Sequence, residues 1–97
     1  MLKSFEVFTK HLRDLRKEKN LRQEDVAAEL NTTRQTISKY ERGDRQPDFH
    51  MLREIAEFYD VSIDYLFGRT QIRKVSVLDV MLLLDWYWPV KTVDRKD

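Results

Sequence analysis

The stretch "RQEDVAAELNTTRQTISKYERG", residues 22–43, contains two short helix patterns separated by a three-residue turn. In the first pattern, from about residue 23 to residue 30, Val26, Ala27 and Leu30 recur at the spacing of one helix face. Acidic residues occupy its first turn, where the helix dipole favours negative charge. Because Ala27 has a small side chain, a second helix can cross closely over the first.

The second pattern has a start signal and a stop signal. Thr33 is a good N-cap for a helix from Arg34 to about Arg42, and Gly43 is suited to the left-handed conformation that ends a helix. In the turn between the helices, Asn31 can take the left-handed conformation usually given to glycine. Two short helices joined in this way form a helix-turn-helix, which places its second helix in the major groove of DNA.

The second helix is polar on one face and apolar on the other. At about 100° per residue, its polar positions fall within about 140° of arc, while Ile37 and Tyr40 lie on the opposite side. Every side chain on the polar face can donate or accept hydrogen bonds. These polar positions are Arg34, Gln35, Ser38, Lys39 and Arg42.

Three further helices are predicted around this pair. Ser4 can cap a first helix, in which apolar residues recur at spacings of three and four, and Asn20 can end it. Asp48 follows a proline and can cap a fourth helix, and Ser62 can cap a short fifth helix that Gly68 closes. The expected buried stripes are Phe5, Phe8, Leu12 and Leu15 in the first helix and Phe49, Leu52, Ile55, Ala56 and Tyr59 in the fourth.

The composition agrees with a small helical domain. The chain has 97 residues, 41% of them hydrophobic, with only two glycines and two prolines, which is too few for a turn-rich β protein. The absence of cysteine excludes a disulfide framework and the usual thiolate zinc site. We found no apolar signal region and no segment long and uncharged enough to span a bilayer, so a cytoplasmic location is expected.

The charges are unevenly distributed although the net charge is only +1. Residues 1–20 carry six Lys or Arg against three acids, whereas residues 46–68 carry one against five. Such polarity can orient a molecule on a polyanion.

Residues 12–68 resemble the XRE-like family, the phage-repressor and Cro type of helix-turn-helix regulator. The resemblance rests on "RQEDVAAEL", then "TISKYERG", then a proline-led helix, then "VSIDYLFG". It implies an all-α, five-helix, lambda-repressor-like DNA-binding domain in residues 1–68. Residues 69–97 lie outside the shared pattern and are expected to form a C-terminal apolar helical extension.

The resemblance also implies which residues contact DNA. Gln23 matches a phosphate contact that braces the first side chain of the recognition helix, while Arg42 and Arg45 match a region that grips the phosphate backbone. Arg16 and Glu41 match a pair that ties the first helix to the third. The full expected DNA-binding set is Gln23, Thr33, Arg34, Gln35, Ser38, Lys39, Arg42 and Arg45, of which Arg34, Gln35 and Lys39 match base-reading positions. Two residues depart from the family pattern, namely Arg22 at a cap position and Asn31 at the turn glycine, and the start of the second helix is expected to be less firm.

Catalysis and metal binding have no support in the sequence. His11 and His50 are far apart and have no clustered carboxylates near them, so no metal site is expected. Ser38 has no evident base or oxyanion donors. No enzyme activity and no cofactor are therefore predicted.

The C-terminal segment is the most apolar part of the chain. Residues 75–90 include 12 apolar residues, which one solvated helix cannot hide. A helix over residues 77–87 is expected, with pairing as strands as the alternative. A two-fold homodimer would cover the segment, and folding back on its own domain or binding a partner protein would also do so. The expected contact residues are Val77, Val80, Met81, Leu83, Leu84, Trp86 and Trp88.

The predicted function is therefore a sequence-specific regulator that binds double-stranded DNA, expected to be a repressor that acts as a homodimer on a two-fold operator. The alternative is an antitoxin-like regulator whose C-terminal extension binds a partner protein.

Overall fold

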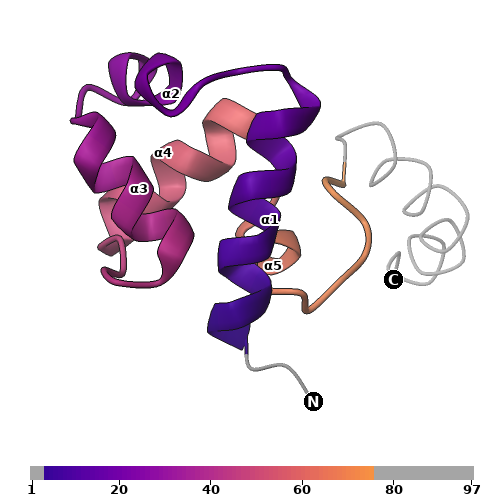
Figure 1. Cartoon of the computed structure of the whole chain (residues 1–97). Helices are drawn as coiled ribbons and strands as arrows, with labels where there is room; N and C mark the ends of the chain where they lie inside the picture. The colour runs from indigo at the N-terminus through magenta and orange to yellow at the C-terminus, as the bar shows by residue number, and fades with distance from the viewer. Residues whose placement is uncertain (1–3, 76–97) are drawn as a thin grey trace, which may run out of the picture.

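The computed structural model describes residues 4–75, and all of its secondary structure in that range is helical. Figure 1 shows the short helices α2 and α3 side by side, with α1 running past α3 and α5. None of the helices in this range is long and apolar enough to cross a membrane. The five helices are α1 (Ser4–Glu18), α2 (Gln23–Glu29), α3 (Arg34–Arg42), α4 (Phe49–Tyr59) and α5 (Ile63–Leu66). The expected all-α, five-helix architecture is confirmed.

Three helices begin at the predicted caps. The side chains of Thr33, Asp48 and Ser62 each accept a hydrogen bond from the backbone N–H three residues later, at 3.1, 2.8 and 2.9 Å. Each bond satisfies a backbone donor that the helix itself leaves free. The α1 helix differs, because it already includes Ser4, and the prediction that Ser4 precedes the helix as its cap is wrong.

The start of α2 is held from inside the helix. Arg22 at the cap position has no side-chain acceptor, but the Asp25 carboxylate accepts a bond from the Arg22 backbone N–H at 2.8 Å. The Arg22 guanidinium also donates to Asp25 at 3.1 and 3.2 Å, and these bonds lower the pKa of the Asp25 carboxyl. The acid in the first turn thus compensates for the poor cap.

Left-handed residues end the helices where the sequence predicted. Asn31 has a φ of 57° in the turn between α2 and α3, and Gly43 has a φ of 82° at the end of α3. Asparagine tolerates this region better than most side chains. The replacement of the usual turn glycine by Asn31 therefore leaves the turn intact.

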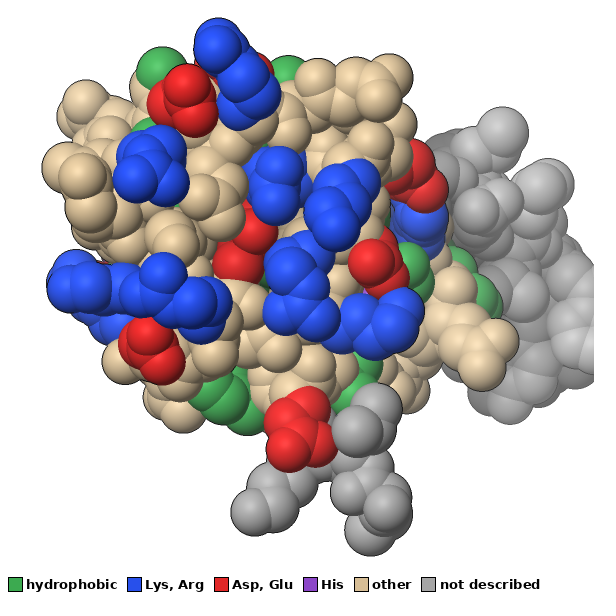
Figure 2. All heavy atoms as spheres, in the orientation of Figure 1, with side chains coloured by type: hydrophobic (Ala, Val, Ile, Leu, Met, Phe, Trp, Pro, Cys, Tyr) green, Lys and Arg blue, Asp and Glu red, His purple; other side chains and the backbone are tan. Residues whose placement is uncertain are grey.

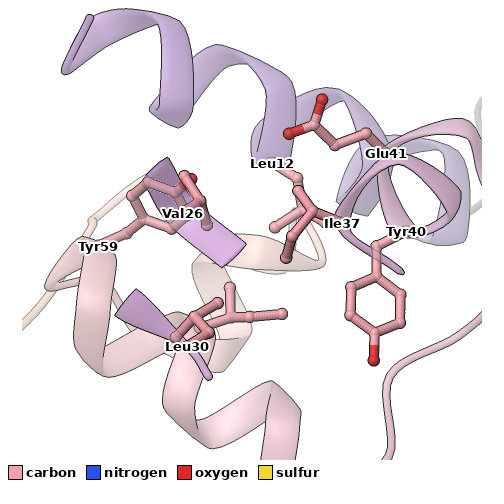
Figure 3. Close-up of a pocket in the computed structure, with 8 residues that line it drawn as sticks. Leu12, Val26, Leu30, Ile37, Tyr40, Glu41 and Tyr59 are labelled. Atoms are coloured by element: carbon pink, nitrogen blue, oxygen red, sulfur yellow. The ribbon is translucent and has the colours of Figure 1, made fainter. Parts of the chain in front are cut away.

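The core takes buried side chains from all five helices, including Leu66 of α5. Figure 3 shows Leu12, Leu30 and Ile37 converging from different helices on one small cavity, with Tyr59 beside them. The cavity holds about 10 Å³, which is at the lower limit for one water molecule. It is a packed interior and leaves no room for a cofactor.

One predicted core residue is exposed. Phe49, in the first turn of α4, has 68% of its surface accessible, although Ile55, Ala56 and Tyr59 on the same stripe are buried. Helical periodicity gives the direction of a side chain but not whether another helix lies opposite its first turn.

The predicted contact residues in the C-terminal extension lie outside the described residues.

A buried ion pair ties α1 to α3. Arg16 donates from Nε to Glu41 Oε2 at 2.7 Å and from Nη2 to Glu41 Oε1 at 2.9 Å. The two side chains are only 14% and 4% exposed. Arg16 also donates to the Leu21 carbonyl at 3.0 Å, which fixes the loop that leads into α2. The bond to Glu41 is the main reason that the pKa of Arg16 is raised.

Breaking this pair should destabilise the domain strongly. Glu41→Ala leaves a largely buried cation without its partner, and we expect it to lower the free energy of unfolding by about 3 to 5 kcal/mol. Urea unfolding of Arg16→Ala, Glu41→Ala and the double mutant gives the coupling energy, expected to be about 1 to 3 kcal/mol. The exposed pair Lys10 and Asp14 provides the control cycle, expected to give under about 1 kcal/mol. A coupling energy near zero for Arg16 and Glu41 would contradict the structural role of the pair.

Tyr59 should make the domain sensitive to alkali. Burial raises the pKa of its hydroxyl, with the Glu41 carboxylate adding to the shift. Above about pH 10, the unfolded chain loses this proton before the folded chain does, so the free energy of unfolding falls as pH rises. The fall is at most about 1.4 kcal/mol per pH unit. Urea melts of wild type and Tyr59→Phe between pH 8 and about pH 11.5 measure the effect. The phenylalanine variant should show the shallower decline, and identical pH profiles would refute the assignment.

Candidate nucleic-acid interface

The polar side of α3 lies open to solvent. Arg34, Gln35, Lys39 and Arg42 are exposed, while Ile37 and Tyr40 on the opposite side are 4% exposed and hold the helix against the core. A shallow hollow of about 170 Å³ lies on this side of α3 and is lined by the five polar positions, Ser38 included. The structure thus gathers the predicted polar face of α3 on one accessible surface.

Basic side chains continue from α3 onto α1. Figure 2 shows lysine and arginine side chains over both helices on the same face of the molecule. The acids nearby are partly neutralised by ion pairs, such as Lys10 with Asp14 on α1 and Arg42 with Asp44 after α3. This face is therefore well suited to a polyanion.

Gln23 connects the recognition helix to the buried ion pair. Its amide nitrogen donates to Glu41 Oε1 at 3.1 Å, and its amide oxygen accepts a bond from Arg34 Nη1 at 3.3 Å. Because a carboxylate only accepts hydrogen bonds, Glu41 determines that the amide nitrogen faces inward and the oxygen faces Arg34. The resemblance implied the contact between Gln23 and Arg34, but the link from Gln23 to Glu41 was not predicted.

A second set of hydrogen bonds holds the end of α3. Arg42 donates to Ser38 Oγ at 2.9 Å and to Asp44 Oδ2 at 2.9 Å. Ser38 is therefore occupied as an acceptor, and its hydroxyl hydrogen remains available as a donor. At the other end of α3, the Thr33 hydroxyl serves as the cap and lies 2.9 Å from the Thr36 hydroxyl.

Three predicted contact residues have their polar groups available. Within residues 4–75, the side chains of Gln35, Lys39 and Arg45 make no hydrogen bond or ion pair, and all three are exposed. Gln35 and Lys39 lie on the hollowed side of α3. Arg45 lies in the loop after Gly43. They can form bonds to a ligand without first breaking bonds within the domain.

Arg13 on α1 also adjoins this surface, although it was not predicted to do so. Its guanidinium donates to the backbone carbonyl of Glu41 at 2.8 Å, next to Arg42. The spacing of Arg13 and Arg16 could have indicated this contact, because residues three apart on a helix share nearly the same face and Arg16 was already expected to lie against α3. The sequence did not show how closely that face approaches the end of α3.

The described residues form no metal centre. In residues 4–75, no group of three or more His, Cys, Asp or Glu side chains is placed to hold a metal ion. His11 instead stacks on Tyr65 at 4.6 Å, and His50 pairs with Glu54 on α4.

Comparisons with known proteins agree with this architecture. A family model described as helix-turn-helix matches residues 12–66. The transcriptional regulator YqaE of Bacillus subtilis is 39% identical over 69 residues, which cover 71% of this chain and 60% of that protein. The regulator ImmR of Bacillus subtilis is 33% identical over 72 residues, or 74% of this chain and 57% of that protein.

A phage protein is similar over more of its own length. The cryptic phage CTXphi transcriptional repressor RstR of Vibrio cholerae is 31% identical over 83 residues, which cover 75% of each chain. The chain thus spans about 60% of the length of the two Bacillus relatives and three quarters of RstR. No solved structure gave a significant match.

The matched segment contains all of α2, α3 and α4 and the tie from Arg16 to Glu41, so the similarity covers the elements that present the polar face of α3. The chain belongs to the XRE-like helix-turn-helix family of DNA-binding transcriptional regulators, which are not enzymes.

Proposed function

We propose that this protein is a cytoplasmic repressor that binds a two-fold operator in double-stranded DNA as a homodimer. The observation that carries the proposal is the exposed polar face of α3, whose first side chain is hydrogen-bonded through Gln23 to the buried pair of Arg16 and Glu41. A side chain positioned before binding loses less conformational freedom when it meets a base.

Arg34, Gln35 and Lys39 are proposed to read the bases. An arginine pairs bidentately with guanine and a glutamine with adenine in the major groove, and each good pair contributes about 1 to 3 kcal/mol of discrimination. Both Arg34 and Gln35 project from the first turn of α3, the part of a recognition helix that meets base edges. The contact at 3.3 Å between Gln23 and Arg34 supports a defined orientation for the guanidinium.

The phosphate backbone of DNA is proposed to bind at the N-termini of α2 and α3 and at the turn after α3. Gln23 lies at the N-terminus of α2, where free backbone N–H groups favour an anion, and Thr33 lies at the N-terminus of α3. Arg42 and Arg45 flank the turn after α3. Arg42 can exchange Asp44 for a phosphate, since that ion pair is exposed and therefore weak.

Two arguments support the dimer, namely the apolar composition of the C-terminal segment and the two-fold symmetry that a pair of recognition helices requires. Its 12 apolar residues between positions 75 and 90 would cover one another across a two-fold axis, with the side chains from Val77 to Trp88 as the proposed contacts. Such an axis can place two α3 helices one DNA turn apart, about 34 Å. Repression is supported by the similarity to RstR of Vibrio cholerae, which is a transcriptional repressor.

Removing the two base-reading side chains should abolish specificity without unfolding the domain. We expect Arg34→Ala with Gln35→Ala to weaken binding to an operator selected from random duplexes by about 2 to 6 kcal/mol, and to change binding to unrelated DNA far less. Fluorescence anisotropy with both duplexes measures the difference, and a thermal melt checks folding.

The matched control removes phosphate contacts instead. Arg42→Ala or Arg45→Ala should weaken binding to every duplex and reduce the slope of log K against log salt by about one. Retention of the full operator preference by the Arg34 and Gln35 double mutant would refute the proposed base readers.

Truncation tests the proposed dimer. Residues 69–75 contact α1, α4 and α5, so the cut should fall after Val75. A protein lacking residues 76–97 should fold, sediment as a monomer at micromolar concentration, and bind a half-site without cooperative binding to the full operator. Analytical ultracentrifugation compares it with the full chain. A monomeric full chain, or a truncated dimer, would contradict the proposal.

Co-purification with a second protein at equal stoichiometry would instead favour the antitoxin-like function. In that case the apolar segment would bind the partner protein, while α3 would still bind DNA. Affinity purification of the full chain from its native host distinguishes the two functions.

A further inference from the structure

Residues 69–75, which we call the strap, fold back onto the domain after α5 ends. Figure 1 shows this segment, in orange, running along the side of α1. Gly68 turns the chain with a φ of 75°, and a Cβ atom at this position would lie 2.7 Å from the Val7 side chain. The Arg73 carbonyl then accepts a bond from the Ser62 N–H at 2.6 Å. The strap is thus bonded to the start of α5 as well as connected to its end.

Arg73 makes the strap's main contacts. Its two terminal nitrogens donate to the two oxygens of Glu18, at 2.7 and 2.8 Å, at the end of α1. Its guanidinium also lies over the Tyr65 ring at 5.6 Å. His11 also stacks on the Tyr65 ring, and its Nδ1 lies 3.1 Å from the Leu66 carbonyl. The bonds from Arg73 lower the pKa of the Glu18 carboxyl.

Lys74 attaches the strap to a third helix. Its Nζ donates to Asp60 Oδ1 at 2.5 Å, and Asp60 is the left-handed residue that ends α4. Two consecutive strap residues therefore connect the ends of α1 and α4 and the ring of Tyr65 on α5. A single exposed ion pair contributes little to stability. A bidentate arginine–carboxylate pair contributes more, especially where several charges form a network.

The strap carries the chain toward the apolar C-terminal segment. The side chains of Ile72 and Val75 on the strap are 62% and 56% exposed, and 11 further apolar residues follow within positions 76–90. A flexible linker of seven residues would spread its ends over about 15 Å, close to half of the 34 Å or so between recognition helices on adjacent DNA turns. Because the strap is bonded to the domain, the distance between its two ends is fixed.

We propose that the strap sets the direction in which the chain leaves the DNA-binding domain, and through it the spacing of the two recognition helices in the dimer. Arg73 is then a positioning residue, which acts through its bonds to Glu18 and its contact with Tyr65. This inference rests on the proposed dimer, because spacing has no meaning for a monomer.

Hydrogen exchange tests the clamp on the full-length protein without involving DNA. The Ser62 amide, which is bonded to the Arg73 carbonyl, should exchange at least about tenfold faster in Arg73→Ala than in wild type. The matched control is Arg69→Ala, which removes the same charge from the same segment where the pairing with Asp64 is loose at 3.7 Å, and it should change the rate by less than about twofold. The charge-swapped pair Glu18→Arg with Arg73→Glu should restore slow exchange.

Operator spacing tests the consequence. Wild type should prefer the selected operator over versions with one or two base pairs inserted between the half-sites, by about tenfold or more. Arg73→Ala should lose most of that preference while its half-site affinity and its dimer dissociation constant in ultracentrifugation stay within about twofold of wild type. Arg69→Ala should keep the preference.

The outcomes separate this inference from the dimer itself. Fast exchange of the Ser62 amide in wild type, or an intact spacing preference in Arg73→Ala, would refute the proposed role of the strap. Neither result would contradict the proposed dimer. A wild-type protein that sediments as a monomer overturns the dimer, and the spacing role of the strap with it.

Discussion

The buried ion pair between Arg16 and Glu41 ties α1 to α3 and is bonded through Gln23 to Arg34 at the start of α3. It joins α1 to α3 at a point where the Glu41 side chain is only 4% exposed. A charge at that depth is tolerated because several donors satisfy it, two from Arg16 and one from Gln23. The position of α3 on the core is therefore fixed by directional bonds as well as by the packing of Ile37 and Tyr40.

The same carboxylate connects the interior to the proposed reading surface. Glu41 orients the amide of Gln23, and Gln23 accepts a bond from Arg34 at the first turn of α3. Each step follows from hydrogen-bond polarity, since a carboxylate only accepts and an amide has one donating and one accepting end. An exposed arginine is thereby given a preferred direction by a buried group that no DNA would touch.

The distribution of ion pairs separates two sides of the molecule. Arg73 and Lys74 neutralise Glu18 and Asp60 at the ends of α1 and α4, and the bonds from these cations lower the pKa of both carboxyls. On the polar side of α3, Lys39 has no acidic partner among the described residues. Within residues 46–68, the acids Glu57, Asp60 and Asp64 pair instead with Arg53, Lys74 and Arg69.

Apart from the start of α1 at Ser4 and the left-handed stop of α4 at Asp60, the sequence predicted the helix ends, because caps and left-handed stops are local: Thr33, Asn31 and Gly43 act within four residues of their own positions. It also determined which face of α3 is polar, since that face follows from helical periodicity alone. The sequence did not show that Phe49 is exposed, that Gln23 bonds to Glu41, or that Arg73 bonds to Glu18 across 55 positions of the chain. These outcomes depend on which helices lie opposite one another, and spacing along one helix does not contain that information.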